Sequence, residues 1–155
     1  MSIFYFAYGS CMDKKRLKRH EVLQEFEVIG IGRIDGWRFR MNKLSSTGQN
    51  VWANVEKDHS SHVYGILYQI SEIGHRYLDI RENFPEHYRK EFVTVNVGKQ
   101  VFEDVMMYQA TPEHISTEKC PTTMEYAEEL KRGGASLPEP YRSEIFLKEI
   151  ERCFS

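Results

Sequence analysis

The length and composition of the chain fit one globular domain. Its 155 residues are 41% hydrophobic and 13% aromatic, which suffices for a sizeable core, so we expect a single domain over residues 1–155. The formal charge is -2, from 21 basic and 23 acidic residues. This balance argues against nucleic acid or an anionic membrane as a partner and favours a small zwitterionic ligand.

The chain begins with a predicted strand and a tight loop. The apolar, aromatic-rich run Ile3 to Ala7 stops at Tyr8-Gly9-Ser10-Cys11-Met12, which predicts a fully buried strand that delivers the loop. Asp13 can then cap a short helix. The basic segment Lys14 to His20 is compatible with that helix, and we expect it to form a solvated face without a chemical role.

A strand-rich region follows. From Glu25 to Asp58, β-branched and aromatic residues alternate with polar ones. Interruptions at Asp35-Gly36 and at residues 45–50 predict strands joined by turns. Residues 63–70 continue the alternating pattern.

A short helix and a hairpin come next. Ser71 can cap a helix of about two turns, which ends in the sequence Leu78 to Glu82. The segment Tyr88 to Val97 returns to a period of two residues. Gly98-Lys99 then turns the chain into Val101 to Tyr108, which predicts a β-hairpin.

The last third of the chain is helical in character. Thr122 to Glu125 resembles a capping box for one helix, which Gly133-Gly134 closes. Two prolines precede a final helix, whose shared apolar face consists of Phe146, Ile150 and Cys153. With strands in the first two thirds and helices in the last, the predicted class is α+β. The expected architecture is a mixed, strongly curved sheet or a small β-barrel flanked by helices.

The cysteines and the N-terminus favour a reducing compartment. Cys11, Cys120 and Cys153 are odd in number and lack CxxC spacing, so they predict neither a disulfide framework nor a zinc site. The apolar run at the N-terminus is short and has no basic segment before it, unlike a signal peptide, and no apolar stretch is long enough for a transmembrane helix. We therefore expect a cytoplasmic protein. His59 and His62 have no third ligand at suitable spacing, so we expect no metal there.

Three stretches, in this order, resemble the gamma-glutamyl cyclotransferase family. They are Phe6 to Met12, then Leu78 to Glu82 followed by Tyr88, and then Pro121 to Tyr126 continuing to Gly134-Ala135 and to Leu137 through Tyr141. Between them, residues 63–68 resemble the family's central strand. Each stretch alone is a weak signal, but their joint order is specific and the likeness covers nearly the whole chain.

The resemblance implies a fold, an activity and a set of site residues. The family's fold is similar to the predicted curved sheet with helices, and its activity releases 5-oxoproline from a gamma-glutamyl amide without a cofactor or metal. By this resemblance Glu82 is the catalytic acid/base, and the loop from Tyr8 to Met12 holds the glutamyl moiety. Many members carry Asn where this chain has Cys11 and Gly where it has Asn83. Neither departure removes the carboxylate.

This reaction needs few protein groups because its nucleophile belongs to the substrate. The alpha-ammonium must lose a proton and attack the gamma-carbonyl, and a site that holds the folded conformer lowers much of the barrier. One carboxylate such as Glu82, one turn beyond Leu78, can take that proton and return a proton to the departing amine. Gly9 allows loop amides to approach a carboxylate or oxyanion closely. Three tyrosines are expected to add hydroxyl donors around the site: Tyr88, Tyr108 and Tyr126.

Other functions stay open at this point. An amide hydrolase or acyltransferase can use the same Glu82 to activate water or an external amine, and a non-catalytic binding module can share the fold. Cys11 is expected to pack in the loop and not to act as a nucleophile, because this reaction needs none. The motifs do not identify the leaving amine, which is an amino acid, a lysine side chain, cysteinylglycine or a biosynthetic intermediate. A homodimer is also left open.

Overall fold

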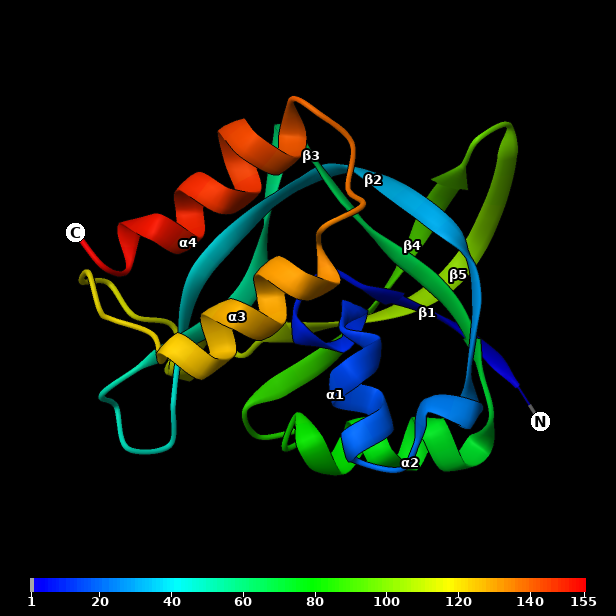
Figure 1. Cartoon of the computed structure of the whole chain (residues 1–155), viewed down its shortest axis with the longest axis horizontal. Helices are drawn as coiled ribbons and strands as arrows, with labels where there is room; N and C mark the ends of the chain where they lie inside the picture. The colour runs from blue at the N-terminus through cyan, green and yellow to red at the C-terminus, as the bar shows by residue number, and fades with distance from the viewer. Residues whose placement is uncertain (1) are drawn as a thin grey trace.

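The chain folds around a closed β-barrel with helices outside it (Figure 1). The computed structural model describes residues 2–155. Within that range the barrel has five strands: β1 (Ile3–Ala7), β2 (Phe26–Leu44), β3 (Val51–Ile70), β4 (Tyr88–Val97) and β5 (Gln100–Ala110). Their order around the barrel is β1-β3-β2-β4-β5. The pairing of β1 with β5 is parallel and the other pairings are antiparallel, so the predicted α+β class with a small mixed barrel is confirmed.

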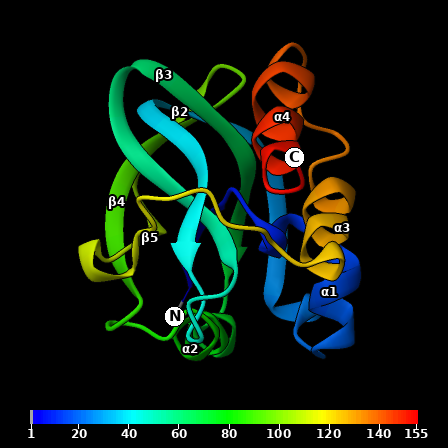
Figure 2. The ribbon, with the colours of Figure 1, turned by 90° about the vertical axis from the view of Figure 1, so that its left-hand side faces the viewer.

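The helices cover one side and one end of the barrel. They are α1 (Lys14–Arg19), α2 (Glu72–Arg81), α3 (Met124–Gly133) and α4 (Lys148–Arg152), the last continuing a π-helical segment (Arg142–Leu147). Short 3₁₀ segments lie at Ser10–Met12, Leu23–Glu25 and Pro112–His114. Figure 2 shows α1, α3 and α4 stacked along one side of the barrel, with α2 across its lower end.

Two long strands form much of the barrel wall. β2 and β3 have 19 and 20 residues and pair along most of their length. The predicted turn at Asp35-Gly36 is wrong, because β2 continues through it with a register shift between Asp35 and Trp37. Gly36 has φ +83, a left-handed conformation open to glycine, and such an irregularity bends a strand without ending it. The interruption at residues 45–50 is confirmed as the loop between the two strands.

The helix caps follow local sequence rules with one displacement. Asp13 and Ser71 cap α1 and α2 as predicted, and each side chain accepts a hydrogen bond from a backbone amide of the first turn. The capping box predicted at Thr122 to Glu125 is wrong by one residue. Thr123 is the N-cap of α3, and its hydroxyl accepts a hydrogen bond from the amide of Tyr126 at 3.1 Å.

The predicted hairpin and C-terminal helix are both present. β4 and β5 pair as an antiparallel hairpin around residues 98–99. Phe146, Ile150 and Cys153 are buried, and the Phe146 ring packs on Phe39 of β2 with centroids 5.1 Å apart. The core fills the barrel interior and its helical side, and its largest fully buried side chains include Tyr68, Tyr141, Phe6, Phe39, Phe146 and Met12.

Candidate functional site

A cavity of about 520 Å³ opens where several chain segments meet. Its size suits a small ligand. Its wall comes from the loop after β1, the ends of β2 and α2, the start of β3 and helices α1 and α3. The lining residues are Tyr5, Tyr8, Gly9, Ser10, Cys11, Arg16, Lys43, Ser46, Trp52, Ala53, Arg81, Glu82, Asn83, His87, Tyr88, Tyr108, Thr123, Glu125, Tyr126 and Glu129.

Glu82 stands at the C-terminal end of α2, on this wall. Its backbone amide donates to the carbonyl of Leu78 at 2.8 Å, so the last helical turn fixes its position. The side chain is 17% exposed, and its ion-pair contact within residues 2–155 is Nε of Arg81 at 3.9 Å. Burial raises the pKa of the Glu82 carboxyl above its ordinary value, and the cations Arg81, Arg16 and Lys43 act in the opposite direction.

The residue after Glu82 ends the helix with a left-handed turn. Asn83 has φ +50, a conformation that glycine and asparagine adopt more readily than other residues. The amide of Phe84 donates to the carbonyl of Asp79 at 3.0 Å and closes this turn. Asn83 thus meets a backbone requirement that glycine also meets.

The loop after β1 forms a second part of the wall. Gly9, Ser10 and Cys11 line the cavity, whereas Met12 does not and its side chain is buried, 2% exposed. The amide of Met12 donates to the carbonyl of Gly9 at 3.0 Å, which makes the loop a 3₁₀ turn. The amides of Gly9, Ser10 and Cys11 donate to no acceptor within residues 2–155. Three successive amides of this cavity-lining loop are therefore unpaired within residues 2–155.

Tyr88 and Tyr126 bind the same residue of β3. The Tyr88 hydroxyl donates to the carbonyl of Ala53 at 2.8 Å. The Tyr126 oxygen accepts from the amide of Ala53 at 3.1 Å, so its own proton is not used in that bond. Burial raises the pKa of Tyr126 to about 12. Tyr126 therefore keeps a free hydroxyl donor, whereas the Tyr88 donor is occupied.

Tyr8 and Tyr108 are tied to each other and to α2. The Tyr8 hydroxyl donates to the carbonyl of Tyr108 at 2.6 Å. The Tyr108 hydroxyl donates to Oδ1 of Asp79 at 2.6 Å, and Nζ of Lys90 lies 3.1 Å from the same oxygen. Both hydroxyl protons are therefore engaged within the protein, and Tyr108 presents only oxygen lone pairs to a ligand.

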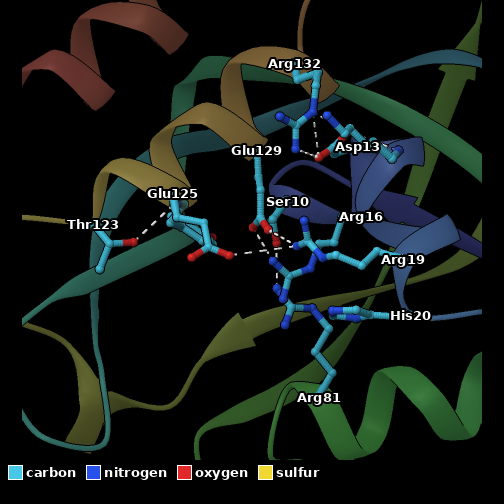
Figure 3. A network of polar contacts seen from close by, with 12 residues as sticks. Ser10, Asp13, Arg16, Arg19, His20, Arg81, Thr123, Glu125, Glu129 and Arg132 are labelled. Atoms are coloured by element: carbon cyan, nitrogen blue, oxygen red, sulfur yellow. Dashed lines mark hydrogen bonds and ion pairs between the residues drawn. The ribbon is translucent and has the colours of Figure 1, made fainter.

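An arginine cluster joins α1, α2 and α3 beside the loop (Figure 3). Nη2 of Arg81 donates to Oγ of Ser10 at 2.7 Å. Arg16 and Arg19 both form ion pairs with Glu129, Arg19 at 2.8 Å, and the Glu129 side chain is only 2% exposed. The cluster fixes the positions of two cavity-lining guanidinium groups, those of Arg16 and Arg81.

The charged residues of the cavity wall were not identified from the sequence. The basic segment 14–20 was expected to be a solvated face, and this is wrong for Arg16, which is 12% exposed and faces Glu129. Two signals were available. Arg81 directly precedes Glu82 in the motif, and Glu129 stands next to Leu130 on the apolar stripe of α3, where an unpaired acid is costly. Nothing in the sequence around Lys43 marked it.

The predicted site residues otherwise converge on one place. Of the nine, eight line the cavity: Tyr8, Gly9, Ser10, Cys11, Glu82, Tyr88, Tyr108 and Tyr126. Across residues 2–155, no group of three His, Cys, Asp or Glu side chains is arranged to hold a metal ion. In the same range no helix has both the length and the apolar character needed to cross a membrane.

Comparison with known proteins gives the family. The family model described as gamma-glutamyl cyclotransferase, AIG2-like, matches residues 5–128. The Bacillus subtilis protein YkqA, provisionally named a gamma-glutamylcyclotransferase, is 30% identical over an alignment length of 152. The alignment covers 88% of this chain and 54% of YkqA. The chain thus spans about half the length of that relative.

Solved structures share the fold. The crystal structure of YkqA has a TM-score of 0.83 at 28% identity. The superposition covers 99% of this chain and 55% of the YkqA chain. A structure of a gamma-glutamyl cyclotransferase has a TM-score of 0.78 at 19% identity, with 93% of this chain and 86% of its own covered. At 19% identity the second comparison shows a shared fold and nothing further. Because the family model matches most of the sequence, from residue 5 to residue 128, this chain belongs to the gamma-glutamyl cyclotransferase family.

Proposed function

We propose that this chain is a cofactor-independent gamma-glutamyl cyclotransferase that converts a gamma-glutamyl amide into 5-oxoproline and a free amine, with Glu82 as the general acid/base. The observation that carries the proposal is the state of this carboxylate. It lies on the wall of the cavity with a pKa raised by burial, and it accepts no hydrogen bond from residues 2–155. A carboxylate held in this way is suited to exchange protons with a bound ligand.

The reaction needs one base and one acid in sequence. Ionised Glu82 takes a proton from the substrate's alpha-ammonium, and the freed amine attacks the gamma-carbonyl carbon. The C–N bond of the five-membered lactam forms, and the carbonyl oxygen becomes an oxyanion. Protonated Glu82 then returns the proton to the amide nitrogen, and the oxyanion re-forms the carbonyl as the bond between that nitrogen and carbon breaks, which regenerates the carboxylate. The ring nitrogen still carries a second proton, which the Glu82 carboxylate takes and passes to the released amine, so that the products are the neutral lactam and an ammonium.

The loop after β1 supplies the anion contacts in this proposal. The amides of Gly9, Ser10 and Cys11 are free to donate to the glutamyl alpha-carboxylate. Arg81 donates a hydrogen bond to Ser10 and directly precedes Glu82 in the sequence. In this proposal it supports the loop and adds positive charge near the glutamyl alpha-carboxylate of the substrate. In this proposal the hydroxyl proton of Tyr126, which is not used in the bond to Ala53, stabilises the developing oxyanion.

Asp79 has a positioning role in this scheme. It accepts a hydrogen bond from the Tyr108 hydroxyl, so the Tyr108 oxygen presents lone pairs at the cavity wall. An acceptor of this kind suits the N–H groups of an alpha-ammonium. Glu82 and Tyr108 together then hold the amine before it reacts.

We propose further that the protein is located in the cytoplasm, which is a reducing compartment. Cys11, Cys120 and Cys153, which all lie within residues 2–155, are free thiols. Burial raises the pKa of the Cys11 thiol, which keeps it protonated and disfavours it as a nucleophile. Cys11 therefore acts as a packing residue of the loop.

The decisive experiment is a mass-spectrometric screen of gamma-glutamyl compounds incubated with the protein. We expect stoichiometric 5-oxoproline and free amine. Glutamate in place of 5-oxoproline would identify an amide hydrolase, and a new gamma-glutamyl amide would identify an acyltransferase. Binding without any product would identify a non-catalytic module.

Gly9→Val should impair turnover more than stability. Gly9 packs closely: an added Cβ would lie 3.1 Å from Cβ of Ala53 and 3.7 Å from the Tyr126 oxygen. The larger side chain should push the loop amides away from β3 and lower kcat/KM by about tenfold or more, with an overpacking cost of about 1–3 kcal/mol. Steady-state kinetics and urea unfolding measure both effects. Ordinary kinetics in a folded variant would show that the loop is only structural.

The pH profile of kcat/KM should have an acid limb set by Glu82. The carboxylate must be ionised in the free enzyme to accept a proton, so activity is lost as pH falls through its pKa. Because burial raises that pKa, the midpoint should lie above the ordinary carboxyl value of 4.5. Lys43→Met removes a cation that lowers the pKa of Glu82, so it should move the limb to higher pH. A midpoint at or below 4.5 would contradict the assignment.

A further inference from the structure

A tyrosine in the middle of β1, Tyr5, lines the cavity and was not among the predicted site residues. It pairs with Tyr68 of β3 and with Met106 of β5, so its side chain lies on the same side of the sheet as Tyr68 and as Tyr108, two residues beyond Met106. The Tyr5 ring stacks on the Tyr68 ring with centroids 6.3 Å apart and meets the Tyr108 ring edge-on at 6.1 Å. Three strands therefore fix the direction of the Tyr5 side chain.

The Tyr5 hydroxyl differs from its neighbours in its hydrogen bonds. The hydroxyls of Tyr8, Tyr68 and Tyr108 each donate to a carbonyl or carboxylate oxygen, whereas that of Tyr5 takes part in no hydrogen bond within residues 2–155. Tyr5 is 5% exposed, and its oxygen is not among the fully enclosed atoms that lack a partner, so the oxygen borders the cavity. A hydroxyl removed from bulk water without a partner costs stability, and a ligand bound in the cavity would supply the missing partner.

The Tyr5 hydroxyl is neutral. Burial raises the pKa of Tyr5 well above its ordinary value, and the acidic groups of Cys11 and Glu82 act in the same direction. The hydroxyl therefore keeps its proton and offers the lone pairs of an uncharged oxygen. Cys11 belongs to the loop after β1 and Glu82 ends α2, and all three residues line the same cavity.

The proposed position of the substrate's alpha-ammonium is next to Tyr5. In the proposed function, Glu82 and the Tyr108 oxygen hold this group, and the Tyr108 ring contacts that of Tyr5. An ammonium has three N–H donors, so these two acceptors leave one donor unused. A charged donor left without an acceptor in a buried site is costly, and the unpaired oxygen of Tyr5 can accept it.

We propose that the Tyr5 hydroxyl accepts the third N–H of the alpha-ammonium, so that Glu82, Tyr108 and Tyr5 together bind the reacting amine. This inference rests on the proposed function and adds a residue to its site. When Glu82 takes one proton, the two tyrosine oxygens still hold the two N–H groups that remain. A second carboxylate in the place of Tyr5 would stabilise the ammonium and make its deprotonation harder, whereas a neutral oxygen binds the amine before and after the proton leaves.

The stability of Tyr5→Phe separates this role from a structural one. Because the hydroxyl has no partner within residues 2–155 to lose, the variant should keep its fold and have an unchanged or higher Tm in thermal unfolding. A Tm lower by more than about 4 °C would show that the protein itself uses the hydroxyl, and would overturn the inference.

The binding test compares two ligands that differ only in the alpha-amine, gamma-glutamyl-alanine and its des-amino counterpart glutaryl-alanine. Calorimetric dissociation constants are measured in Glu82→Gln, where gamma-glutamyl-alanine stays intact, and in Glu82→Gln combined with Tyr5→Phe. Loss of the hydroxyl should weaken gamma-glutamyl-alanine roughly 10- to 100-fold, as expected for a hydrogen bond to a charged group, and glutaryl-alanine by less than about threefold. Tyr64→Phe is the matched control. Tyr64 lies beside Arg33 and outside the cavity lining, so its variant should affect neither ligand.

The remaining outcomes are equally clear. Equal weakening of both ligands would place the Tyr5 hydroxyl on another part of the ligand, and no weakening, or no binding of either ligand, would also overturn the inference. With Glu82 present, kcat/KM of Tyr5→Phe for 5-oxoproline formation should fall by a similar factor, and an ordinary value would contradict the proposal. Absence of 5-oxoproline from the unmutated protein would refute the proposed function alone, because the binding comparison still reports on Tyr5.

Discussion

Glu82→Gln should lower kcat by about a hundredfold or more while the fold is kept. Glutamine is nearly isosteric with glutamate and still bonds a ligand, but it cannot accept the ammonium proton. KM should therefore change little. The measurement is 5-oxoproline formation at saturating substrate, with circular dichroism to show that the variant is folded.

Glu86→Gln is the matched control for this variant. Glu86 is exposed and lies four residues beyond Glu82, outside the cavity lining, so its amide variant should retain ordinary activity. Asp79 is a poorer control although it is also close in sequence, because it accepts the Tyr108 hydroxyl and contacts Lys90. Ordinary kcat in folded Glu82→Gln would refute the proposed acid/base.

Glu129→Ala should destabilise the protein by about 3 kcal/mol, because it removes one partner from a buried ion-pair cluster. Glu129 is 2% exposed and neutralises Arg16 and Arg19 at once. Arg19 is 48% exposed and can turn to water, but Arg16 is 12% exposed and is left as an uncompensated charge. Equilibrium unfolding in urea gives the free energy of unfolding. Activity should also fall, since Arg16 and Arg81 line the same wall.

Glu125→Gln distinguishes this effect from general loss of acidic charge on α3. Glu125 lies one turn before Glu129, its side chain is 80% exposed, and its contact with Arg19 is 3.9 Å long. Surface pairs of this kind contribute less than about 1 kcal/mol, so this variant should unfold nearly like the unmutated protein. Equal destabilisation in both variants would contradict a specific role for the buried carboxylate.

Local sequence rules predicted the structure correctly where the interacting atoms belong to residues close to one another along the chain. The caps at Asp13 and Ser71 and the hairpin around Gly98-Lys99 were predicted correctly, because a capping bond or a tight turn involves residues only a few positions apart. The same rules were wrong at Asp35-Gly36. A glycine in the left-handed conformation can form either a turn or an irregularity within a strand. Pairing with the neighbouring strand β3 determines which of the two forms here.

The sequence by itself determined the family motif: a buried strand with its loop, a helix that ends at Glu82, and the tyrosines on later elements. Only the tertiary structure decided which charges surround that carboxylate. Arg16 and Glu129 are 113 residues apart in the chain and form an ion pair, and a single extra residue in β2 turns Lys43 into the cavity. Electrostatic interaction and the cost of burying a charge depend on distance and solvent access in space, and neither quantity can be obtained from spacing along the sequence.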